Sequence, residues 1–480
     1  MTFRAHPITI VVNLRRFLYL IIISVIRGLL AAFQGGLTGW LRGAWVDVLV
    51  VLVMVGLSVL QWRALVYRYE GEHLEIDSGA LVRKRVLVPL GSIVTLSAIH
   101  SFYLRPFRAV RLRMDTLGGG SREADFIVLV HRDTAERAMA LHAGEEQAMV
   151  RRYTPRTTSV LALAFLTSNS LAGIVFIATL ISQSGKLVGA EFSQQLVDTW
   201  ETTARTLAFG IPPAAAAVAY ALLFGWVVGF AITFLRYKNF NVRRSGELLK
   251  IAGGEFTHRE YAFSTRRINF LDIRQSLTSK FLKIYSLYIY SIGYGKYKDD
   301  IACLMPAENK KDFAANLKLL LWEMEPIPRQ LAPAKGGILR FLALPLALGI
   351  GIPAVMGLAR LLFPDWWEFV LFLGLMGLVP VLYFFIIRVM DYRTGGLAFD
   401  GENYTIRYSA GMYLHTVVIP ARRVILIENR QSLMQRRKDR CDCHIFTVAE
   451  GRMCHILRGL DRKKAEEFLN KSYNIYKSSK

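Results

Sequence analysis

One block of sequence occurs three times in this chain, and each copy follows a pair of apolar stretches. The first two copies align without a gap at an offset of 175 residues, which places Leu74, Ile76 and Gly79 on Leu249, Ile251 and Gly254. The second and third copies align at an offset of 156, and Arg274-Gln275-Ser276-Leu277 recurs as Arg430-Gln431-Ser432-Leu433. Unrelated segments rarely share so much register, so we predict three copies of one structural unit.

Each copy is preceded by two stretches that match the roughly 20 helical residues needed to cross a bilayer core. A hydrophobic fraction of 53% and a mean hydropathy of +0.32 fit such a content. A cleaved signal peptide is the competing interpretation of the N-terminus, but no small-x-small cleavage site follows the first stretch. We place the six spans at about Leu14–Phe33, Trp45–Trp62, Ser159–Ile181, Phe209–Phe234, Ile338–Leu358 and Trp366–Ile387.

The distribution of charge predicts the orientation. The chain has a net charge of +23, carried by the N-terminus and the three long segments between and after the hairpins, whereas the short connections are net acidic. Because Lys and Arg are retained on the cytoplasmic side, both termini and all three repeated segments are expected there. The four cysteines all lie in those segments, which argues against disulfides.

The repeated segment is predicted to be a small β-barrel closed by a C-terminal helix. In the first copy, Asp77-Ser78-Gly79 is a hairpin signal between two β-rich runs. A helix begins near Asp133, and Asp461 is the expected N-cap of the corresponding helix in the third copy. The strands of the first copy are expected at His73–Ile76, Leu81–Pro89, Ile93–His100, Val110–Thr116 and Phe126–His131.

The sequence therefore predicts an α+β membrane protein with six transmembrane helices in three hairpins, each followed by a cytoplasmic β-rich domain with a C-terminal helix. The hairpins are expected at 14–62, 159–235 and 338–387. The domains, called here the first, second and third repeats, are expected at 63–150, 236–325 and 388–476.

This organisation resembles the bacterial PH-domain multi-pass membrane proteins, in particular the long, YdbT-like members with several hairpin-plus-PH repeats. The resemblance rests on a hairpin followed by L-x-I-x-x-G, a hydrophobic-Pro step and a later hydrophobic-flanked serine. The proline step is Val88-Pro89 and Ile419-Pro420, and the middle copy departs from it with Ser264. The serines are Ser101, Ser276 and Ser432.

The resemblance implies an integral protein of the bacterial cytoplasmic membrane with no established enzymatic activity and no cofactor. It also implies a smaller, single-repeat membrane protein of the same type as a partner. Phosphoinositide binding is not implied, because it needs a long Lys/Arg-rich loop between the first two strands. Here those turns are only Asp77-Ser78-Gly79, Ala252-Gly253-Gly254 and Ser409-Ala410-Gly411.

Two basic clusters are the candidate contacts to an anionic phospholipid surface or to a partner. They are Arg83-Lys84-Arg85, which we place in the second strand of the first repeat, and Arg436, Arg437, Lys438 and Arg440 in the third repeat. Attraction to an anionic inner leaflet is worth on the order of 1 kcal/mol per basic residue. A solvated surface is the alternative interpretation. Nucleic acid is not expected, because exposed aromatics do not alternate with the cations.

Thiols and imidazoles near the C-terminus raise the question of a zinc site. The repeat alignment places Cys441 and Cys443 on Tyr285 and Leu287, on the apolar face of a strand, so we predict buried hydrophobic cysteines and no metal site. No P-loop, H-E-x-x-H, G-x-S-x-G or dinucleotide fingerprint occurs, and the chain is not expected to be an enzyme.

Several membrane features have both a structural and a functional interpretation. Arg27 can snorkel to the outer surface, and Gly225-x-x-x-Gly229 permits close helix packing. Pro345, Pro353 and Pro380 are positioned to break helices as in transporters, and Ser168 and Asn169 are a weak polar pair. A stripe in the external connection predicts an amphipathic surface helix and consists of Val188, Phe192, Leu196 and Trp200.

Three functions are compatible with the sequence: a membrane-anchored interaction scaffold, a transporter of lipids or small molecules, and a sensor of envelope stress. We favour the scaffold, with a role in envelope stress or membrane homeostasis, and homo-oligomerisation is compatible with it. The strand assignment makes its own prediction, because a charge at a shared apolar strand position should unfold its repeat. Ile268→Asp and Val424→Asp are the variants that test it.

Overall fold

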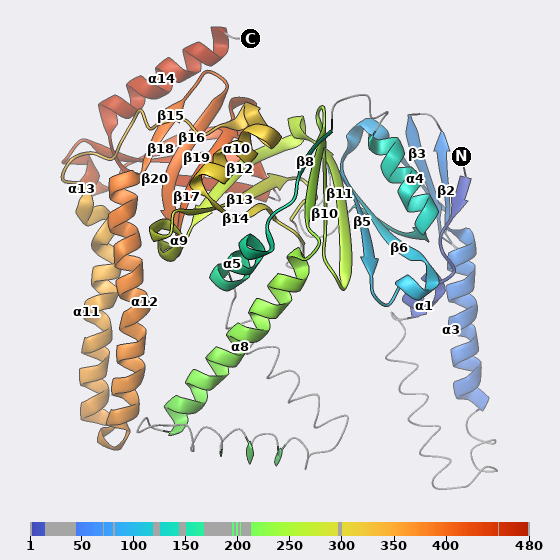
Figure 1. Cartoon of the computed structure of the whole chain (residues 1–480), viewed down its shortest axis with the longest axis horizontal. Helices are drawn as coiled ribbons and strands as arrows, with labels where there is room; N and C mark the ends of the chain where they lie inside the picture. The colour runs from blue at the N-terminus through green and yellow to red at the C-terminus, as the bar shows by residue number, and fades with distance from the viewer. Residues whose placement is uncertain are drawn as a thin grey trace. The chain divides into compact units, whose positions relative to one another are not determined.

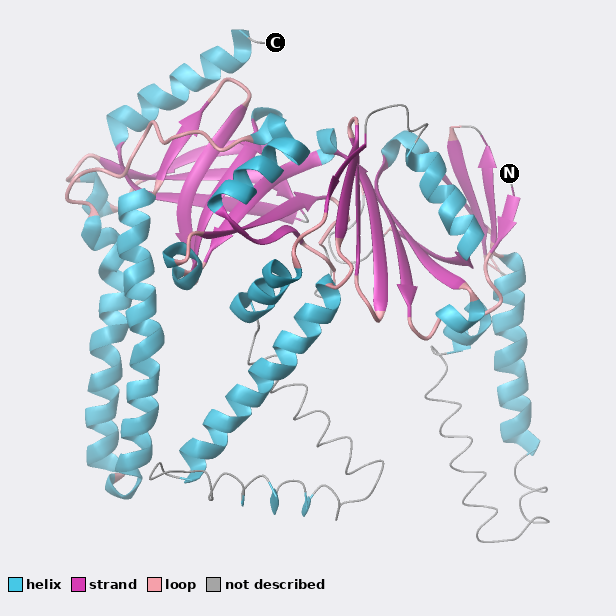
Figure 2. Cartoon of the chain, viewed as in Figure 1, coloured by secondary structure: helices cyan, strands magenta, loops and turns pink. Residues whose placement is uncertain are grey.

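The computed structural model of the chain describes residues 2–14, 45–70, 72–79, 82–118, 125–143, 150–167, 194, 195, 198, 199, 202, 213–295, 300–449 and 451–478. Helices and strands are both abundant, as expected for the α+β class (Figures 1 and 2).

In the first repeat and the segment before it, the described residues include a long apolar helix, strands of two sheets and a C-terminal helix. Their elements are β1 (Thr2–Arg4), α1 (Thr9–Leu14), α3 (Trp45–Ala64), β2 (Val66–Glu70), β3 (His73–Ser78), β4 (Lys84–Pro89), β5 (Ile93–Ser101), β6 (Ala109–Thr116), β7 (Phe126–His131) and α4 (Arg132–Ala143). The five strands predicted from the sequence are confirmed, with shifts of a few residues at their ends. The strands β1 and β2 were not predicted.

The second repeat follows the same order. Its elements, with those of the preceding segment, are β8 (Val150–Tyr153), α5 (Thr157–Thr167), α8 (Pro213–Tyr237), β9 (Asn241–Ser245), β10 (Leu248–Gly253), β11 (Thr257–Ser264), β12 (Ile268–Gln275), α9 (Leu277–Phe281), β13 (Ile284–Ser291), β14 (Cys303–Asn309) and α10 (Lys310–Leu321).

The third repeat, taken with the segment before it, begins with two long helices that lie side by side (Figure 1). Its elements are α11 (Ile338–Leu362), α12 (Trp367–Thr394), β15 (Gly396–Phe399), β16 (Asn403–Ala410), β17 (Tyr413–Pro420), β18 (Val424–Arg430), α13 (Leu433–Arg436), β19 (Arg440–Ala449), β20 (Gly451–Asp461) and α14 (Arg462–Ser478). The backbone N–H of Lys464 donates to Asp461 Oδ1 at 3.1 Å, which confirms Asp461 as the N-cap of the last helix.

Three of the predicted spans are helices long and apolar enough to cross a membrane: Tyr220–Tyr237, Ile338–Leu362 and Pro364–Thr394. Leu49–Ala64 and Thr157–Thr167 are shorter apolar helices. The predicted span 14–33 lies almost wholly outside the described residues, and so does most of 159–181. Arg27, Ser168, Asn169 and the external stripe are outside them as well. Helices α11 and α12 continue without a break through their prolines.

The described chain divides into two compact units. Unit 1 comprises residues 1–150, 244–252 and 256–267, and unit 2 comprises residues 151–243, 253–255 and 268–480. The boundary falls inside the second repeat, between β11 and β12. Unit 1 therefore combines the first repeat with the early strands of the second repeat, and unit 2 combines the later strands of the second repeat with the third repeat.

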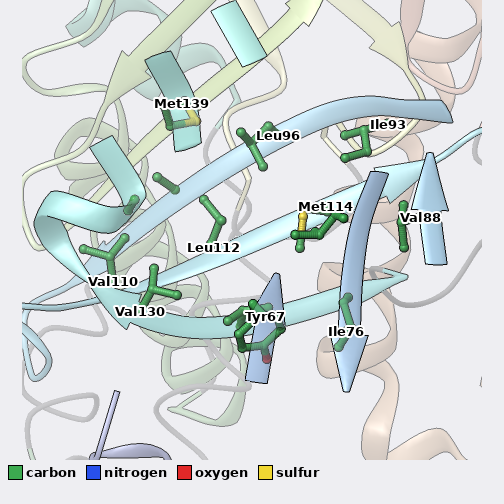
Figure 3. Close-up of a cluster of buried hydrophobic side chains, with 14 of the residues drawn as sticks. Tyr67, Ile76, Val88, Ile93, Leu96, Val110, Leu112, Met114, Val130 and Met139 are labelled. Carbon is green, nitrogen blue, oxygen red and sulfur yellow. The ribbon is translucent and has the colours of Figure 1, made fainter. Parts of the chain in front are cut away.

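Unit 1 contains two sheets that enclose a hydrophobic core. One sheet has the order β1-β2-β3-β4, and the other runs β7-β6-β5-β11-β10. Side chains from both sheets and from α4 meet between them, among them Tyr67, Ile76, Leu96, Leu112 and Met139 (Figure 3). Ala262 of β11, which belongs to the second repeat, is part of the same core.

Unit 2 repeats this arrangement. Its larger sheet has the order β14-β13-β12-β17-β16-β15, and a smaller sheet has the order β18-β19-β20. The core between them is formed mainly by the third repeat and also includes Phe270 of β12, which comes from the second repeat.

The expected closed barrels are not found among the described strands. Instead, the later strands of one repeat continue into the early strands of the next. Strand β5 pairs with β11, and β12 pairs with β17, both antiparallel. The two junctions have the same register, because His100 faces His258 in the first and Gln275 faces Leu414 at the equivalent position in the second. The outer backbone groups of β5 and β12 thus obtain partners from the neighbouring repeat.

The Arg-Gln-Ser-Leu motif has a structural explanation. The amide of Gln275 donates to the Ile284 carbonyl at 2.8 Å, and Gln431 makes the same bond to Arg440 at 2.7 Å. The serine that follows is the N-cap of a short helix, Ser276 for α9 and Ser432 for α13. The repeated motif therefore closes the same loop in both repeats.

Candidate functional site

A cleft of about 660 Å³ lies in unit 2, where the sequences of the second and third repeats meet. Its walls come from α10, from the segment after it, from the end of α12 and from strands β12, β16 and β17. The residues used below are Lys280, Lys310, Lys318, Glu325, Arg329, Arg393 and Arg407, all of which line this cationic cleft.

The cationic cleft has a large excess of positive charge. Six Lys and Arg side chains line it, and Glu325 is its one lining carboxylate. Glu325 lies 3.8 Å from Lys318 Nζ and is 41% exposed, so it balances little of this charge. Cations held together in this way repel one another unless an anion is bound.

Two of the six cations, Lys280 and Arg407, are partly buried, and the pKa of each is lowered. Burial, followed by the charges of Arg407 and Lys310, lowers the pKa of Lys280. Burial and then the charge of Arg329 lower the pKa of Arg407. Both shifts mean that the charged form is disfavoured where it stands.

The hydrogen bonds of these two side chains leave capacity for a ligand. Arg407 Nη2 donates to the Ile327 carbonyl, whereas Nη1 is buried and has no hydrogen-bond acceptor among the described residues. Lys280 Nζ donates to Gln275 Oε1 at 3.3 Å, which uses one of its three protons. A buried guanidinium nitrogen without an acceptor is costly, and an oxyanion would satisfy it.

The charge and the free hydrogen-bonding capacity of the cationic cleft match a multiply charged oxyanion, and the cleft lies at one end of a membrane-length helix. Arg393 and Thr394, at the end of the membrane-length helix α12, line the cleft. Arg329 Nη1 donates to the Arg393 carbonyl at 2.6 Å and thereby fixes the segment after α10 to the end of α12. Phosphate oxygens match both guanidinium forks and lysine ammonium groups.

Unit 1 contains a second cavity of about 480 Å³, which we call the apolar cavity. Phe3, Tyr67, Leu96, Leu112 and Met114 are among its mostly hydrophobic lining, and the last four are labelled in Figure 3. The lining also includes Arg137, Arg267 and His142. Arg267 Nη1 donates to the Ile93 carbonyl at 3.1 Å, and burial lowers the pKa of His142.

The first predicted basic cluster lies at the edge of a sheet in unit 1. Arg85 pairs with Glu75 at 2.8 Å and with Asp77 at 3.1 Å, so its charge is balanced. Arg83 and Lys84 are exposed, at and just before the start of β4. This cluster does not line the cationic cleft.

The second predicted cluster is also separate from the cleft lining. Arg436, Arg437 and Lys438 are exposed at and after the end of α13. Arg440 is engaged, because its guanidinium donates to the carbonyls of Gly336 at 3.1 Å and Lys335 at 2.9 Å, just before α11. Arg440 thus has a structural role in fixing α11 to the third repeat.

Little in the sequence pointed to the residues of the cationic cleft. Lys280, Arg329, Arg393 and Arg407 are isolated cations in the sequence. The pairing of β12 with β17 and the hydrogen bonds of Arg329 and Arg407 to the Arg393 and Ile327 carbonyls bring them together. Runs of consecutive basic residues were more conspicuous but point in several directions along a strand.

The cysteines that suggested zinc are part of the core. Cys441 and Cys443 are completely buried among apolar side chains, as predicted. Burial raises the pKa of the Cys441 thiol to about 11 and that of Cys443 to about 12, so both are neutral thiols near pH 7.

Comparison with known proteins agrees with this repeated fold. The family model of the bacterial PH domain matches residues 18–144 and 202–320, which together are about half of the chain. The chain belongs to the bacterial PH domain family. A relative is the UPF0699 transmembrane protein YdbT of Bacillus subtilis (strain 168), which is 22% identical over 339 residues, or 64% of this chain and 67% of that protein. No solved structure matches the chain.

These findings make the chain a membrane protein with bacterial PH domains. The matched segments include apolar stretches as well as the strands that follow them. The first match covers both apolar stretches and most of the domain of the first block, and the second covers the second apolar stretch and most of the domain of the second block.

Proposed function

We propose that this bacterial PH-domain protein is a membrane-anchored interaction platform that binds an anionic, phosphate-bearing ligand in the cationic cleft. The observation that carries the proposal is the convergence of six cations on a cleft lined by residues of two consecutive repeats. Binding there would secure the second and third repeats to one another and to the end of α12.

The proposed setting is the bacterial cytoplasmic membrane, crossed six times by three hairpins, with both termini and all three repeats in the cytoplasm. The net charge of +23 and its concentration in the repeats support this orientation. The inner leaflet would then supply anionic phospholipid close to the end of α12.

The platform is proposed to hold a smaller, single-repeat membrane protein of the same type. Supporting this, adjacent repeats of this chain associate by continuing one another's sheets, and a single-repeat protein would offer the same kind of strand edge. We propose that such an assembly serves membrane homeostasis or the response to envelope stress.

Lipid handling is a second candidate, and the apolar cavity of unit 1 favours it. A cavity of about 480 Å³ lined by aliphatic and aromatic side chains, with Arg137 and Arg267 among them, suits one end of an anionic amphiphile. The continuous helices α11 and α12 argue against a transport path of the broken-helix kind in the third hairpin.

Mass spectrometry of the tagged protein, gently extracted from its native membrane, tests the platform. We expect a stoichiometric anionic phospholipid and a single-repeat membrane protein to copurify with the wild type. The variant Lys280→Gln/Arg407→Gln should lose the lipid by at least tenfold. The control Arg436→Gln/Lys438→Gln removes two exposed charges from the same unit and should retain it.

Different results separate the candidates. A phosphate-bearing metabolite that replaces the lipid would keep the cleft as the site and change the source of the ligand. A lipid that survives Lys280→Gln/Arg407→Gln but is lost in Leu112→Trp, which fills the apolar cavity, would favour lipid handling. Absence of both an anionic ligand and a protein partner would refute the platform.

A further inference from the structure

The two junctions between repeats leave one unmatched strand at each end of the series. Strand β11 pairs with β5, and β17 pairs with β12. The repeat alignment makes β18 the equivalent of β5 and β12, and it makes β4 the equivalent of β11 and β17. Among the described strands, β18 and β4 are both the edges of their sheets.

The side chains of β18 are exposed where their equivalents are buried. Ile425 is 57% exposed, whereas Val94 and Asn269, at the same position in the first and second repeats, are 1% and 0% exposed. Leu426 is 44% exposed, and its equivalents Thr95 and Phe270 are 0% and 1% exposed. Strand β18 thus exposes large apolar side chains at positions where the equivalent strands, β5 and β12, are covered by a neighbouring strand.

The strand β4 shows the complementary pattern. Leu87 is 62% exposed, but Ala262 and Val418, its equivalents in β11 and β17, are fully buried. Ala262 faces Leu96 of β5 and lies in the hydrophobic core of unit 1. Leu87 is therefore an exposed apolar side chain. The equivalent side chains in β11 and β17 are buried against the preceding repeat.

We propose that β4 of a second copy of this chain pairs with β18, so that copies associate head to tail through a third junction of the same kind. The register of the two existing junctions places Leu426 opposite Val88 and Ile427 opposite Leu87 of the second copy. Leu87 would then pack beside Ile427, which contacts the core of the third repeat.

The second copy is the occupant that the structure specifies. Strand β4 is the equivalent of β11 and β17. Those two strands pair with β5 and β12, the equivalents of β18, in one common register. Addition of a strand to an exposed edge supplies main-chain hydrogen bonds, and apolar side chains on alternate positions supply specificity. At the end of the register Lys84 meets Arg430, whose guanidinium is already paired with Glu428 at 2.9 Å.

Such a contact uses different surfaces on the two copies, so it generates a ring or an open row rather than a two-fold dimer. The inference rests on the strand register and goes beyond the ligand proposed for the cationic cleft. Failure of the cleft variants would leave it unaffected, and the reverse also holds.

Cross-linking between two differently tagged full-length copies in the membrane tests the proposal. One copy carries Leu87→Cys and the other Ile427→Cys. Oxidation should produce a disulfide-linked dimer that contains both tags. The control pairs Leu87→Cys with Tyr473→Cys, which is 63% exposed on α14 and is not part of β18, and should give at least tenfold less.

A second measurement protects the test from misfolded variants. Leu87→Asp changes an exposed residue, so the protease resistance of the monomer should not change, while copurification of the two tagged copies should fall at least tenfold. Equal cross-linking by the two cysteine pairs, or copurification unchanged by Leu87→Asp, would overturn the proposal. Cross-linking of Ile427→Cys to a single-repeat protein instead of a second copy would also overturn it.

Discussion

Replacing Phe270 with alanine is expected to destabilise the third repeat more than the second, although the residue belongs to the second. Phe270 is 1% exposed and stacks on Tyr290 with ring centroids 4.3 Å apart. It also meets the ring of His455 edge-on at 4.9 Å, on a strand of the third repeat. Phe270 therefore belongs to the core that the third repeat completes.

The magnitude follows from complete burial. Phe→Ala substitutions in protein cores cost about 3–5 kcal/mol, and the lost aromatic contacts account for about 1 kcal/mol of that. Hydrogen–deuterium exchange of the detergent-solubilised protein measures the effect locally. Protection of amides in β19 and β20 should fall by about two to four powers of ten.

The equivalent residue of the third repeat is the matched control. Leu426 is 44% exposed on the edge strand β18, so Leu426→Ala should cost about 1 kcal/mol or less in the isolated chain. If Phe270→Ala lowered protection only in β13 and β14, the third repeat would not depend on this junction and the shared core would be refuted.

Three further predictions concern unit 2. His455 is 3% exposed, and burial lowers its pKa to about 4, whereas the pKa in an unfolded chain is about 6.5. The stability that the neutral imidazole contributes is therefore complete above pH 6.5 and is lost as the pH falls to 4. Urea unfolding should show a loss of about 3 kcal/mol over this range, and most of the loss should disappear in His455→Gln. Asp442→Ala should cost about 2–3 kcal/mol and raise exchange at the start of α11, because the buried carboxylate accepts from Arg340 at 2.9 Å and from the Gly459 N–H at 2.8 Å; an unchanged exchange rate would exclude this role. Ile268→Asp should remove protease resistance, since Ile268 is fully buried, whereas Val424→Asp, on the partly exposed edge strand, should be much milder; equal sensitivity would contradict the difference in burial between β12 and the edge strand β18.

Local sequence signals predicted the elements of each repeat but not the way the sheets combine. The predicted turn Asp77-Ser78-Gly79 lies at the correct end of β3, but Asp77 and Ser78 still pair with Arg85 and Lys84 of β4, and the connection begins at Gly79 with φ +99°; Asp461 caps the last helix. Both signals act within a few residues. The pairing of β5 with β11 joins residues about 160 positions apart, and alternation along a strand does not reveal which edge it meets.

The cationic cleft was not predicted from the sequence for a related reason. Consecutive cations such as Arg436-Arg437-Lys438 are visible in a sequence, yet they remain on the surface. Lys280 and Arg407 are single residues on α9 and β16, and they converge only because β12 and β17 are neighbours. The alignment of repeats did indicate a further contact surface, because Leu426 and Leu87 are apolar at positions where the equivalent side chains of the other copies are buried.

The most direct test of the shared sheets is a disulfide within one chain across the first junction. His100 and His258 face each other on β5 and β11, with ring centroids 5.9 Å apart, and both are partly exposed. We expect His100→Cys/His258→Cys to form the linked peptide under mild oxidation, detected by mass spectrometry. The slipped pair His100→Cys/Thr257→Cys, whose side chains point to opposite faces, should form little of it. Equal yields from the two pairs, or no linked peptide from either, would contradict the joining of consecutive repeats by a shared sheet.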